Sequence, residues 1–167
     1  MRYYDTFNSP NGKMLLVAND HGLCGVYFQG QKYFPDSNEG KRDPRHVPLR
    51  QAKRELTEYF AGKRKRFEVA LDAQGTPFQR SVWKAISTVG FGETISYAEL
   101  ARRAGHPGSA RAAGAATGRN PIGVIVPCHR IMGADGSLTG YAGGLKRKRA
   151  LLALEGVGRD RRSAAQG

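Results

Sequence analysis

The sequence has little cysteine and no long apolar segment. Its two cysteines, Cys24 and Cys128, cannot build the multiple-disulfide framework of a small secreted domain. No apolar run approaches the roughly 18 residues of a membrane helix, and the N-terminus has no signal-peptide features. These absences predict a protein of the reducing cytoplasm, and 167 residues suffice for one domain or two small ones.

Acidic residues are also scarce, with 14 Asp and Glu against 27 Lys and Arg and a net charge of +13. The imbalance is strongest in residues 76–167, which hold 14 basic and 5 acidic residues, whereas residues 1–75 hold 13 and 9. A basic half favours a polyanionic partner, with nucleic acid ahead of membrane. Charge alone is equally compatible with a solvated basic surface that binds nothing.

No metal-binding or cofactor motif is present. His21 and Cys24 lie close together in the sequence, but no second cysteine or nearby histidine completes a ligand set of the usual spacing. We therefore expect Cys24 to pack inside a strand, and we expect neither a metal nor a cofactor.

The first half predicts a small antiparallel sheet with one helix. Residues 3–7, 13–18 and 23–29 have strand character and are separated by turn-forming residues that include an Asn-Gly pair. Residues 31–46 are polar and predict a long loop. Apolar residues at helical spacing predict a helix over 48–60, and alternation predicts a further strand over 67–71. Residues 72–75 are expected to form a linker.

The second half begins with strong helix signals. Thr76 and Gln79 form a capping-box pattern and predict a helix over 77–89, with Trp83 in the core. A second such pattern, Ser96 with Glu99, predicts a helix to about 104, and Ser109 predicts the cap of another helix to 117. Two helices around a short turn are typical of a helix-turn-helix motif.

The second of these helices contains small residues and a single arginine, Arg111. It lacks the Asn, Gln or several Arg side chains that read base edges in the major groove. Close approach with one intruding arginine favours a minor groove. Tight packing against another helix explains the alanines equally well.

Residues 123–126 form an apolar run that predicts a buried strand, although a buried helical segment fits the pattern too. Pro127 ends the run, so Cys128 and His129 lie where the chain leaves the core. A lone cysteine there is more often a small buried apolar residue than a nucleophile. A basic helix begins near 146 and ends at Glu155, where a carboxylate opposes the helix dipole. This placement indicates a specific partner, and His129 is the obvious one.

The segment 119–131, with its Asn-Pro and Pro-Cys-His-Arg elements, closely resembles the active-site signature of the O6-alkylguanine-DNA alkyltransferases. The resemblance continues from about 76 to 156. It implies an α/β (α+β) protein with a ribonuclease-H-like N-terminal domain (1–75) and a winged-helix-like, helix-turn-helix C-terminal domain (76–156). We expect a disordered tail from Val157 onward.

The implied activity is DNA repair by irreversible, single-turnover transfer of an alkyl group to Cys128. The substrates implied are O6-alkylguanine and O4-alkylthymine in duplex DNA, with the base flipped from the minor-groove side. A thioether has no easy leaving step, so the protein is consumed. The resemblance implies a monomer in solution and leaves cooperative assembly on DNA open.

The resemblance also assigns roles to residues. His129 and Glu155 activate Cys128 through a water, Asn120 braces the active-site segment, and Tyr97 helps protonate the departing guanine. Arg111 intercalates into the duplex, and Tyr141 and Ala142 cover the base. The implied DNA-contacting set is Ser96, Tyr97, Ala110, Arg111, Ala112, Ala113, Gly114, Arg119, Tyr141, Ala142 and Gly143.

Two positions depart from many relatives, which have serine at Ala142 and proline or serine at Gly123. Backbone amide must then supply any hydrogen bond from position 142, and the glycine is expected to open the pocket. Three other functions compete. A lesion-binding module would lack the cysteine, a helix-turn-helix regulator would use Cys128 structurally, and a Cys-His-Glu hydrolase would turn over an ester repeatedly.

Overall fold

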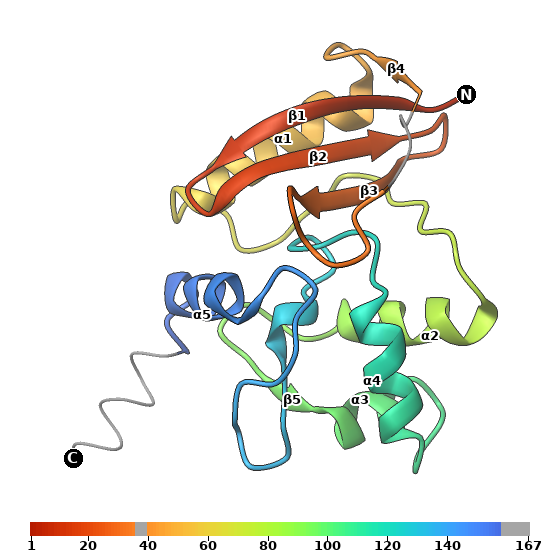
Figure 1. Ribbon diagram of the computed structural model, residues 1–167, viewed down its shortest axis with the longest axis vertical. Helices are drawn as coiled ribbons and strands as arrows, with labels where there is room; N and C mark the ends of the chain where they lie inside the picture. The colour runs from red at the N-terminus through yellow and green to blue at the C-terminus, as the bar shows by residue number, and fades with distance from the viewer. Residues whose placement is uncertain (36–39, 158–167) are drawn as a thin grey trace. The chain divides into compact units, whose positions relative to one another are not determined.

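The computed structural model describes residues 1–35 and 40–157 and divides into two compact units (Figure 1). The first unit contains Met1–Gly75 and Pro121–Ile125, and the second contains Thr76–Asn120 and the chain from Val126 onward. The sequence predicted a single boundary after residue 75, and this boundary leaves the short segment Pro121–Ile125 in the wrong unit. The segment belongs to the first unit because the Val26 N–H donates to the carbonyl of Pro121 at 2.8 Å and the Val26 carbonyl accepts from Gly123 at 3.0 Å.

The first unit is built on a four-stranded sheet of order β3-β2-β1-β4. The antiparallel strands β1 (Tyr3–Ser9), β2 (Gly12–Ala18) and β3 (Leu23–Phe28) confirm the three predicted strands. Strand β4 (Lys41–Arg42) lies within residues 31–46, which were predicted to form a loop, and pairs in parallel with β1. Cys24 is buried in β3, as expected.

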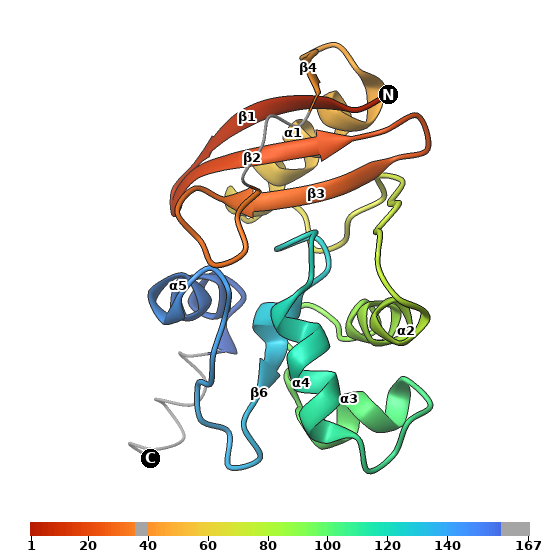
Figure 2. The ribbon, with the colours of Figure 1, turned by 45° about the vertical axis from the view of Figure 1, so that its right-hand side comes forward.

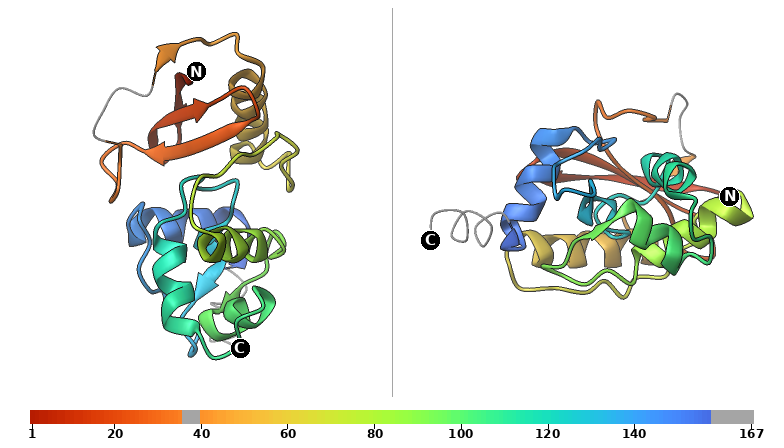
Figure 3. Two further views of the ribbon diagram at one scale, coloured as in Figure 1. Left: turned by 90° about the vertical axis from the view of Figure 1, so that its right-hand side faces the viewer. Right: turned by 90° about the horizontal axis from the view of Figure 1, so that it is seen from below.

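Helix α1 (Val47–Phe60) lies along one face of this sheet (Figures 1 and 3). Its apolar face is buried, which confirms the predicted helix. The strand predicted over 67–71 is wrong, because only Leu71 forms a bridge, with Leu23. The buried Glu55 carboxylate instead accepts the N–H groups of Glu68 and Val69, at 2.9 and 3.2 Å. A side chain thus replaces a neighbouring strand as the hydrogen-bond partner.

The second unit contains three helices that pack on one another (Figure 2), α2 (Pro77–Ile86), α3 (Tyr97–Arg103) and α4 (Ala110–Gly118). Helix α2 has the predicted capping box but ends three residues earlier than predicted. Trp83 is buried and donates to the carbonyl of Ala116 at 2.8 Å, which ties α2 to α4. The predicted helix-turn-helix pair is confirmed as α3 and α4.

Two of the predicted caps are incomplete. Ser96 accepts the N–H of Glu99, but the Glu99 carboxylate binds Arg102 and Arg103 instead of returning to the cap. Ser109 has non-extended backbone angles, with φ −102° and ψ 39°, and makes no side-chain cap. At Ser96 the structure confirms the cap but not the full capping box. Ser109 is the N-cap residue of α4, as predicted, but its side chain makes no cap hydrogen bond.

The remaining elements of the second unit surround the predicted catalytic segment. Two short strands, β5 (Ile95–Ser96) and β6 (Ile131–Met132), pair in parallel, and α5 (Leu145–Leu154) follows. Val157 is buried with Met132 and Leu152, so the tail does not begin at Val157 as predicted. Residues 158–167, the rest of that prediction, lie outside the described residues. No described helix is long and apolar enough to cross a membrane.

The capping box of α2 gives a direct test of local stability. Thr76→Ala removes the acceptor of the Gln79 N–H, bonded at 3.1 Å, and should lower the free energy of unfolding by about 1 kcal/mol. Thr76→Ser keeps the hydroxyl and should retain most of the stability. Urea unfolding followed by circular dichroism measures both, and equal losses in the two variants would contradict a role of the cap.

Candidate active site

Cys128 lies in a 3₁₀ turn, Cys128–Arg130, and does not follow a strand. The strand predicted over 123–126 is wrong: Gly123–Ile125 form a turn, in which Val124 has a φ of +68°. That backbone conformation is unusual for a β-branched residue. The Pro127 carbonyl accepts the N–H of Arg130 at 2.9 Å and closes the 3₁₀ turn. Cys128 is only 7 % exposed and His129 is fully buried.

Asn120 links the end of α4 to this turn. Its buried amide donates to the carbonyl of Val126 at 2.9 Å and also hydrogen-bonds to the Cys128 thiol. Asn120 therefore joins the chain after α4 to the turn that carries Cys128, within the second unit.

Glu155 follows α5 directly and binds two neighbouring residues of the turn. Its Oε2 accepts from His129 Nε2 at 2.8 Å, while Arg130 donates to Oε1 at 2.8 Å and to Oε2 at 3.0 Å. Arg130 also donates to the carbonyl of Val89 at 2.6 Å. Burial raises the pKa of Glu155, but the hydrogen bonds from His129 and Arg130 outweigh burial and hold it at about 2. Glu155 is thus a carboxylate at neutral pH.

This carboxylate assigns the hydrogen on His129. A carboxylate only accepts, so Nε2 must carry the hydrogen, and in the neutral ring Nδ1 then carries the lone pair. Burial lowers the pKa of His129, against the opposing effect of Glu155, and keeps the ring neutral. His129 Nδ1 is buried and has no hydrogen-bond partner among the described residues. The ring therefore offers a basic nitrogen inside the protein.

The thiol of Cys128 needs such a base. Burial raises the pKa of Cys128, although the Asn120 hydrogen bond and the charge of Lys148 act in the opposite direction. The resting thiol is consequently protonated at neutral pH, and only the thiolate is a strong nucleophile.

Lys148 and Arg130 are site residues that the sequence reasoning missed. Lys148 belongs to a basic run, yet it is fully buried and donates to the carbonyls of Ile131 at 2.6 Å and Thr139 at 3.0 Å. Burial lowers its pKa to about 8. Lys148 lies three, four and seven residues before Leu151, Leu152 and Glu155, which is the spacing of one helix face. This spacing could have shown that Lys148 points inward.

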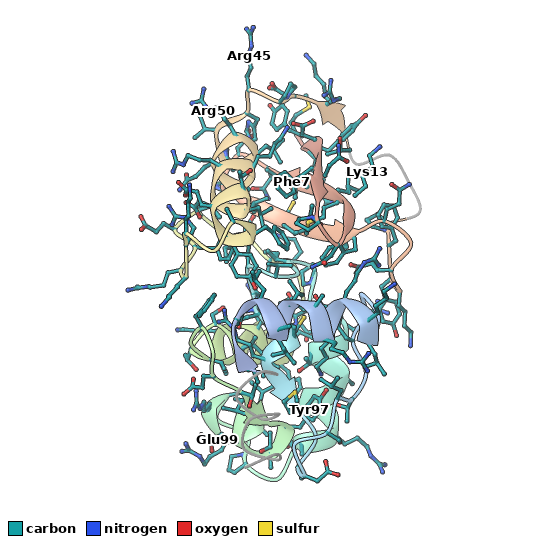
Figure 4. The ribbon with its side chains drawn as sticks, turned by 90° about the vertical axis from the view of Figure 1, so that its left-hand side faces the viewer. Phe7, Lys13, Arg45, Arg50, Tyr97 and Glu99 are labelled. Atoms are coloured by element: carbon teal, nitrogen blue, oxygen red, sulfur yellow. The ribbon has the colours of Figure 1, made fainter. Side chains whose placement is uncertain are left out.

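Tyr97 stands apart from this hydrogen-bonded group, at the start of α3. Its hydroxyl lies 3.0 Å from Thr139 Oγ1, and the side chain is labelled among those of the second unit in Figure 4. Thr139 was not singled out in the sequence, where it is one polar residue of a glycine-rich loop.

The residues predicted to contact DNA differ in exposure. Arg111, Ala112 and Arg119 are exposed, whereas Ala113 is fully buried and packs into the unit. Gly143 is also buried. Neither Ala113 nor Gly143 belongs to the exposed face, contrary to their predicted place in a contact surface. The others are half-buried: Ser96, Tyr97, Ala110, Gly114, Tyr141 and Ala142.

The local structure explains why position 123 is a glycine. A Cβ built there would lie 3.3 Å from the Val26 carbonyl oxygen in the same unit, so the glycine suits the close approach to β3. Among the described residues, no group of three His, Cys, Asp or Glu side chains could hold a metal ion.

Family models match both units. The ribonuclease-like domain of 6-O-methylguanine DNA methyltransferase matches residues 2–73, and the DNA-binding domain of the same family matches 77–157. The chain therefore belongs to the 6-O-methylguanine DNA methyltransferase family, a class of DNA-repair enzymes that move a methyl group to a protein cysteine.

Particular relatives are close over nearly the whole chain. The methylated-DNA–protein-cysteine methyltransferase of Mycobacterium tuberculosis is 48 % identical over 93 % of both chains, and that of Methanosarcina acetivorans is 48 % identical over 92 % of this chain and 98 % of the relative. The crystal structure of the M. tuberculosis O6-methylguanine methyltransferase matches with a TM-score of 0.84 over 93 % of both chains, at 48 % identity. M. tuberculosis OGT in complex with DNA matches with a TM-score of 0.83, at 47 % identity over 92 % of both chains. These matches confirm the fold class and the enzyme class that the sequence predicted.

The pair Glu155 and His129 predicts a distinctive pH dependence. Glu155→Gln removes the charge that stabilises the imidazolium formed when His129 takes the thiol proton, so alkylation should slow at least about tenfold at neutral pH. Because the pKa of Cys128 is raised, the thiol ionises by itself only in alkaline solution, and the two rates should converge there. Rates of methyl transfer measured from about pH 6 to about pH 11, beyond the ordinary range of a cysteine thiol, test this.

Glu99→Gln is the matched control, because Glu99 binds two arginines on an exposed helix. It should leave the rate unchanged at every pH. Thermal unfolding identifies any loss of folded Glu155→Gln protein. A Glu155→Gln rate equal to wild type at neutral pH, or profiles that stay parallel over this whole pH range, would exclude activation of Cys128 by this pair.

Proposed function

We propose that Cys128 accepts an alkyl group from O6-alkylguanine in duplex DNA, and from O4-alkylthymine, and keeps it permanently. The observation that supports this best is the buried arrangement of Glu155, His129 and Cys128, in which the hydrogen on His129 is assigned to Nε2. A neutral histidine with a free Nδ1, adjacent to a protonated thiol, is suited to remove one proton in a single reaction.

The proton of Cys128 passes to His129 Nδ1 through a bridging water. The side chains of adjacent residues seldom face each other directly, and a water can span them. Glu155, which Arg130 holds in place, binds the ring while it carries the proton. The sulfur then attacks the alkyl carbon, a C–S bond forms, and the bond between carbon and the guanine oxygen breaks.

The departing guanine takes a proton from the Tyr97 hydroxyl. The product on Cys128 is a thioether, which unlike an acyl-cysteine has no easy leaving step. Each chain therefore reacts once. This separates the chain from a cysteine hydrolase, and the presence of Cys128 separates it from a module that only binds lesions.

The exposed face of α4 approaches the minor groove of DNA. Its small side chains Ala110, Ala112 and Gly114 permit close contact, and Arg111 enters the base stack where the damaged nucleotide has flipped out. Outside α4, Arg119, Ser96, Tyr141 and Ala142 complete the contact surface. The protein is a monomer in solution and acts on chromosomal DNA in the cytoplasm.

The first test identifies the acceptor. Incubation with an oligonucleotide that carries O6-methylguanine should raise the intact mass of the chain by one methyl group, with no second turnover. Cys128→Ser should show no mass increase, because a hydroxyl is far less acidic than a thiol. The variant should still bind DNA. Cys24→Ser is the matched control and should react normally. Methylation located at Cys24 would contradict the assignment of Cys128.

The second test concerns Arg111. Flipping a base costs a few kcal/mol, and a side chain that fills the gap offsets part of this. Arg111→Ala should slow reaction with duplex DNA by roughly tenfold or more. It should scarcely change reaction with free O6-benzylguanine, which needs no flipping. A lesion opposite an abasic site should partly restore the duplex rate.

Lys84→Ala is the control for the loss of one exposed positive charge in the same unit. If Arg111 only binds a phosphate, Arg111→Ala should weaken DNA binding and lower its salt dependence by about one contact. Lys84→Ala then shows how much of this effect comes from the lower net charge alone. Equal slowing of the free-base and duplex reactions by Arg111→Ala would disprove the flipping role.

A further inference from the structure

Thr139 lies between two groups of the active-site region and contacts both. Its side-chain oxygen is 3.0 Å from the Tyr97 hydroxyl, and its backbone carbonyl accepts from Lys148 Nζ at 3.0 Å. The same ammonium group donates to the carbonyl of Ile131, at the start of β6, at 2.6 Å. A fully buried lysine thus fixes the backbone of the residue that meets Tyr97.

The ring of Tyr97 also lies close to α4. A Cβ built on Gly114 of α4 would lie 3.5 Å from Tyr97 Cδ1 and 3.7 Å from Cε1, which is ordinary van der Waals contact. The ring therefore packs beside α4 at its glycine, while Thr139 holds the hydroxyl end.

The hydrogen bond between the two hydroxyls can have either direction. If Tyr97 donates to Thr139, its only hydrogen is used and cannot pass to a base. If Thr139 donates, the Tyr97 oxygen accepts and the phenolic hydrogen is free. Only the second arrangement is compatible with Tyr97 as a proton donor.

We propose that Thr139 is a positioning residue for the repair reaction, and that it donates its hydroxyl hydrogen to Tyr97 so that the phenolic hydrogen is presented to the departing guanine. This inference rests on the proposed function, in which Tyr97 protonates the guanine. Lys148 contributes indirectly, by fixing the backbone on which the Thr139 hydroxyl is carried.

The hydrogen bond also serves the chemical step itself. As the C–S bond forms and the carbon–oxygen bond breaks, the electron pair moves onto the guanine, which takes the proton of Tyr97. The thiol proton remains on His129, and Tyr97 becomes a phenolate. A hydrogen bond to an oxygen is stronger when the oxygen is charged, so Thr139 stabilises the phenolate more than the phenol. Water then returns a proton to Tyr97.

The experiment is a double-mutant cycle on the rate of methyl transfer at saturating DNA. Thr139→Val removes the hydroxyl at nearly constant shape and should lower the rate about tenfold. Thr139→Ser keeps the hydroxyl and should retain most of the rate. Tyr97→Phe should slow the reaction, and adding Thr139→Val to Tyr97→Phe should slow it no further, because the two residues act through one hydrogen bond.

Two controls separate this role from a structural one. Ser137→Ala removes a hydroxyl from the same loop, where it binds Asp135, and should leave the rate unchanged. Iodoacetamide alkylates a thiol with iodide as leaving group, which needs no proton. Thr139→Val should therefore react with iodoacetamide at Cys128 as fast as wild type, as located by peptide mass mapping.

The outcomes are distinguishable. If Tyr97→Phe reacts at the wild-type rate, the acid role of Tyr97 in the proposed function is wrong, and the inference fails with it. If Tyr97→Phe is slow but Thr139→Val is fast, or if the two effects multiply, the inference alone is wrong. Slower iodoacetamide labelling in Thr139→Val would mean that Thr139 acts on Cys128 or on the fold, which also overturns it.

Discussion

The active-site region depends on one buried carboxylate. Glu155 ends α5, where its charge opposes the helix dipole, and it stands away from water, which is costly for a charge without partners. Arg130 supplies a paired charge with two hydrogen bonds, and His129 supplies a third. Through Arg130 the same group reaches the Val89 carbonyl just beyond α2. One carboxylate thus joins three separate stretches of the second unit.

Burial and the surrounding charges together determine the protonation state of His129. A carboxylate alone beside a buried histidine favours the charged imidazolium, which has no lone pair to offer. Burial has the largest effect on the pKa of His129 and lowers it, Glu155 acts in the opposite direction, and the positive charges of Arg130 and Lys148 lower the pKa further. The ring stays neutral and its tautomer stays fixed. Glu155 sets the orientation of the ring, and burial, helped by the nearby positive charges, keeps its lone pair available at rest.

Sequence periodicity predicted the elements that bury a regular face. The three long strands and α1 follow from alternation and helical spacing, and the capping residues of α2 marked its start. The apolar run at 123–126 was misassigned because apolar content reports burial, whereas the Val124 conformation, with φ +68°, is not encoded in a local pattern. The two-residue strands β5 and β6 are too short for any periodicity to appear.

Some residues of the candidate site could likewise be predicted from the sequence, and others could not. Cys128, His129, Asn120 and Glu155 were found through a motif and through an unfavourable charge at a helix end. Lys148 was overlooked because composition places it among surface lysines, although its spacing with Leu151 and Leu152 places it inward. Ala113 was included in a contact surface because a motif carries no information on which face of a helix is buried. Thr139 became visible only when its distance to Tyr97 was known.

The segment Pro121–Ile125 has a consequence for the way this chain can be divided. Since it belongs to the first unit while its flanking residues belong to the second, the polypeptide crosses between the units at 75/76, 120/121 and 125/126. A truncation that begins at Thr76 would carry this segment without Val26, its hydrogen-bond partner. The first unit expressed alone would lack what pairs with the edge of β3. The two units are thus interleaved along the chain, and recombination or domain exchange between homologues has to move Pro121–Ile125 together with the N-terminal sheet.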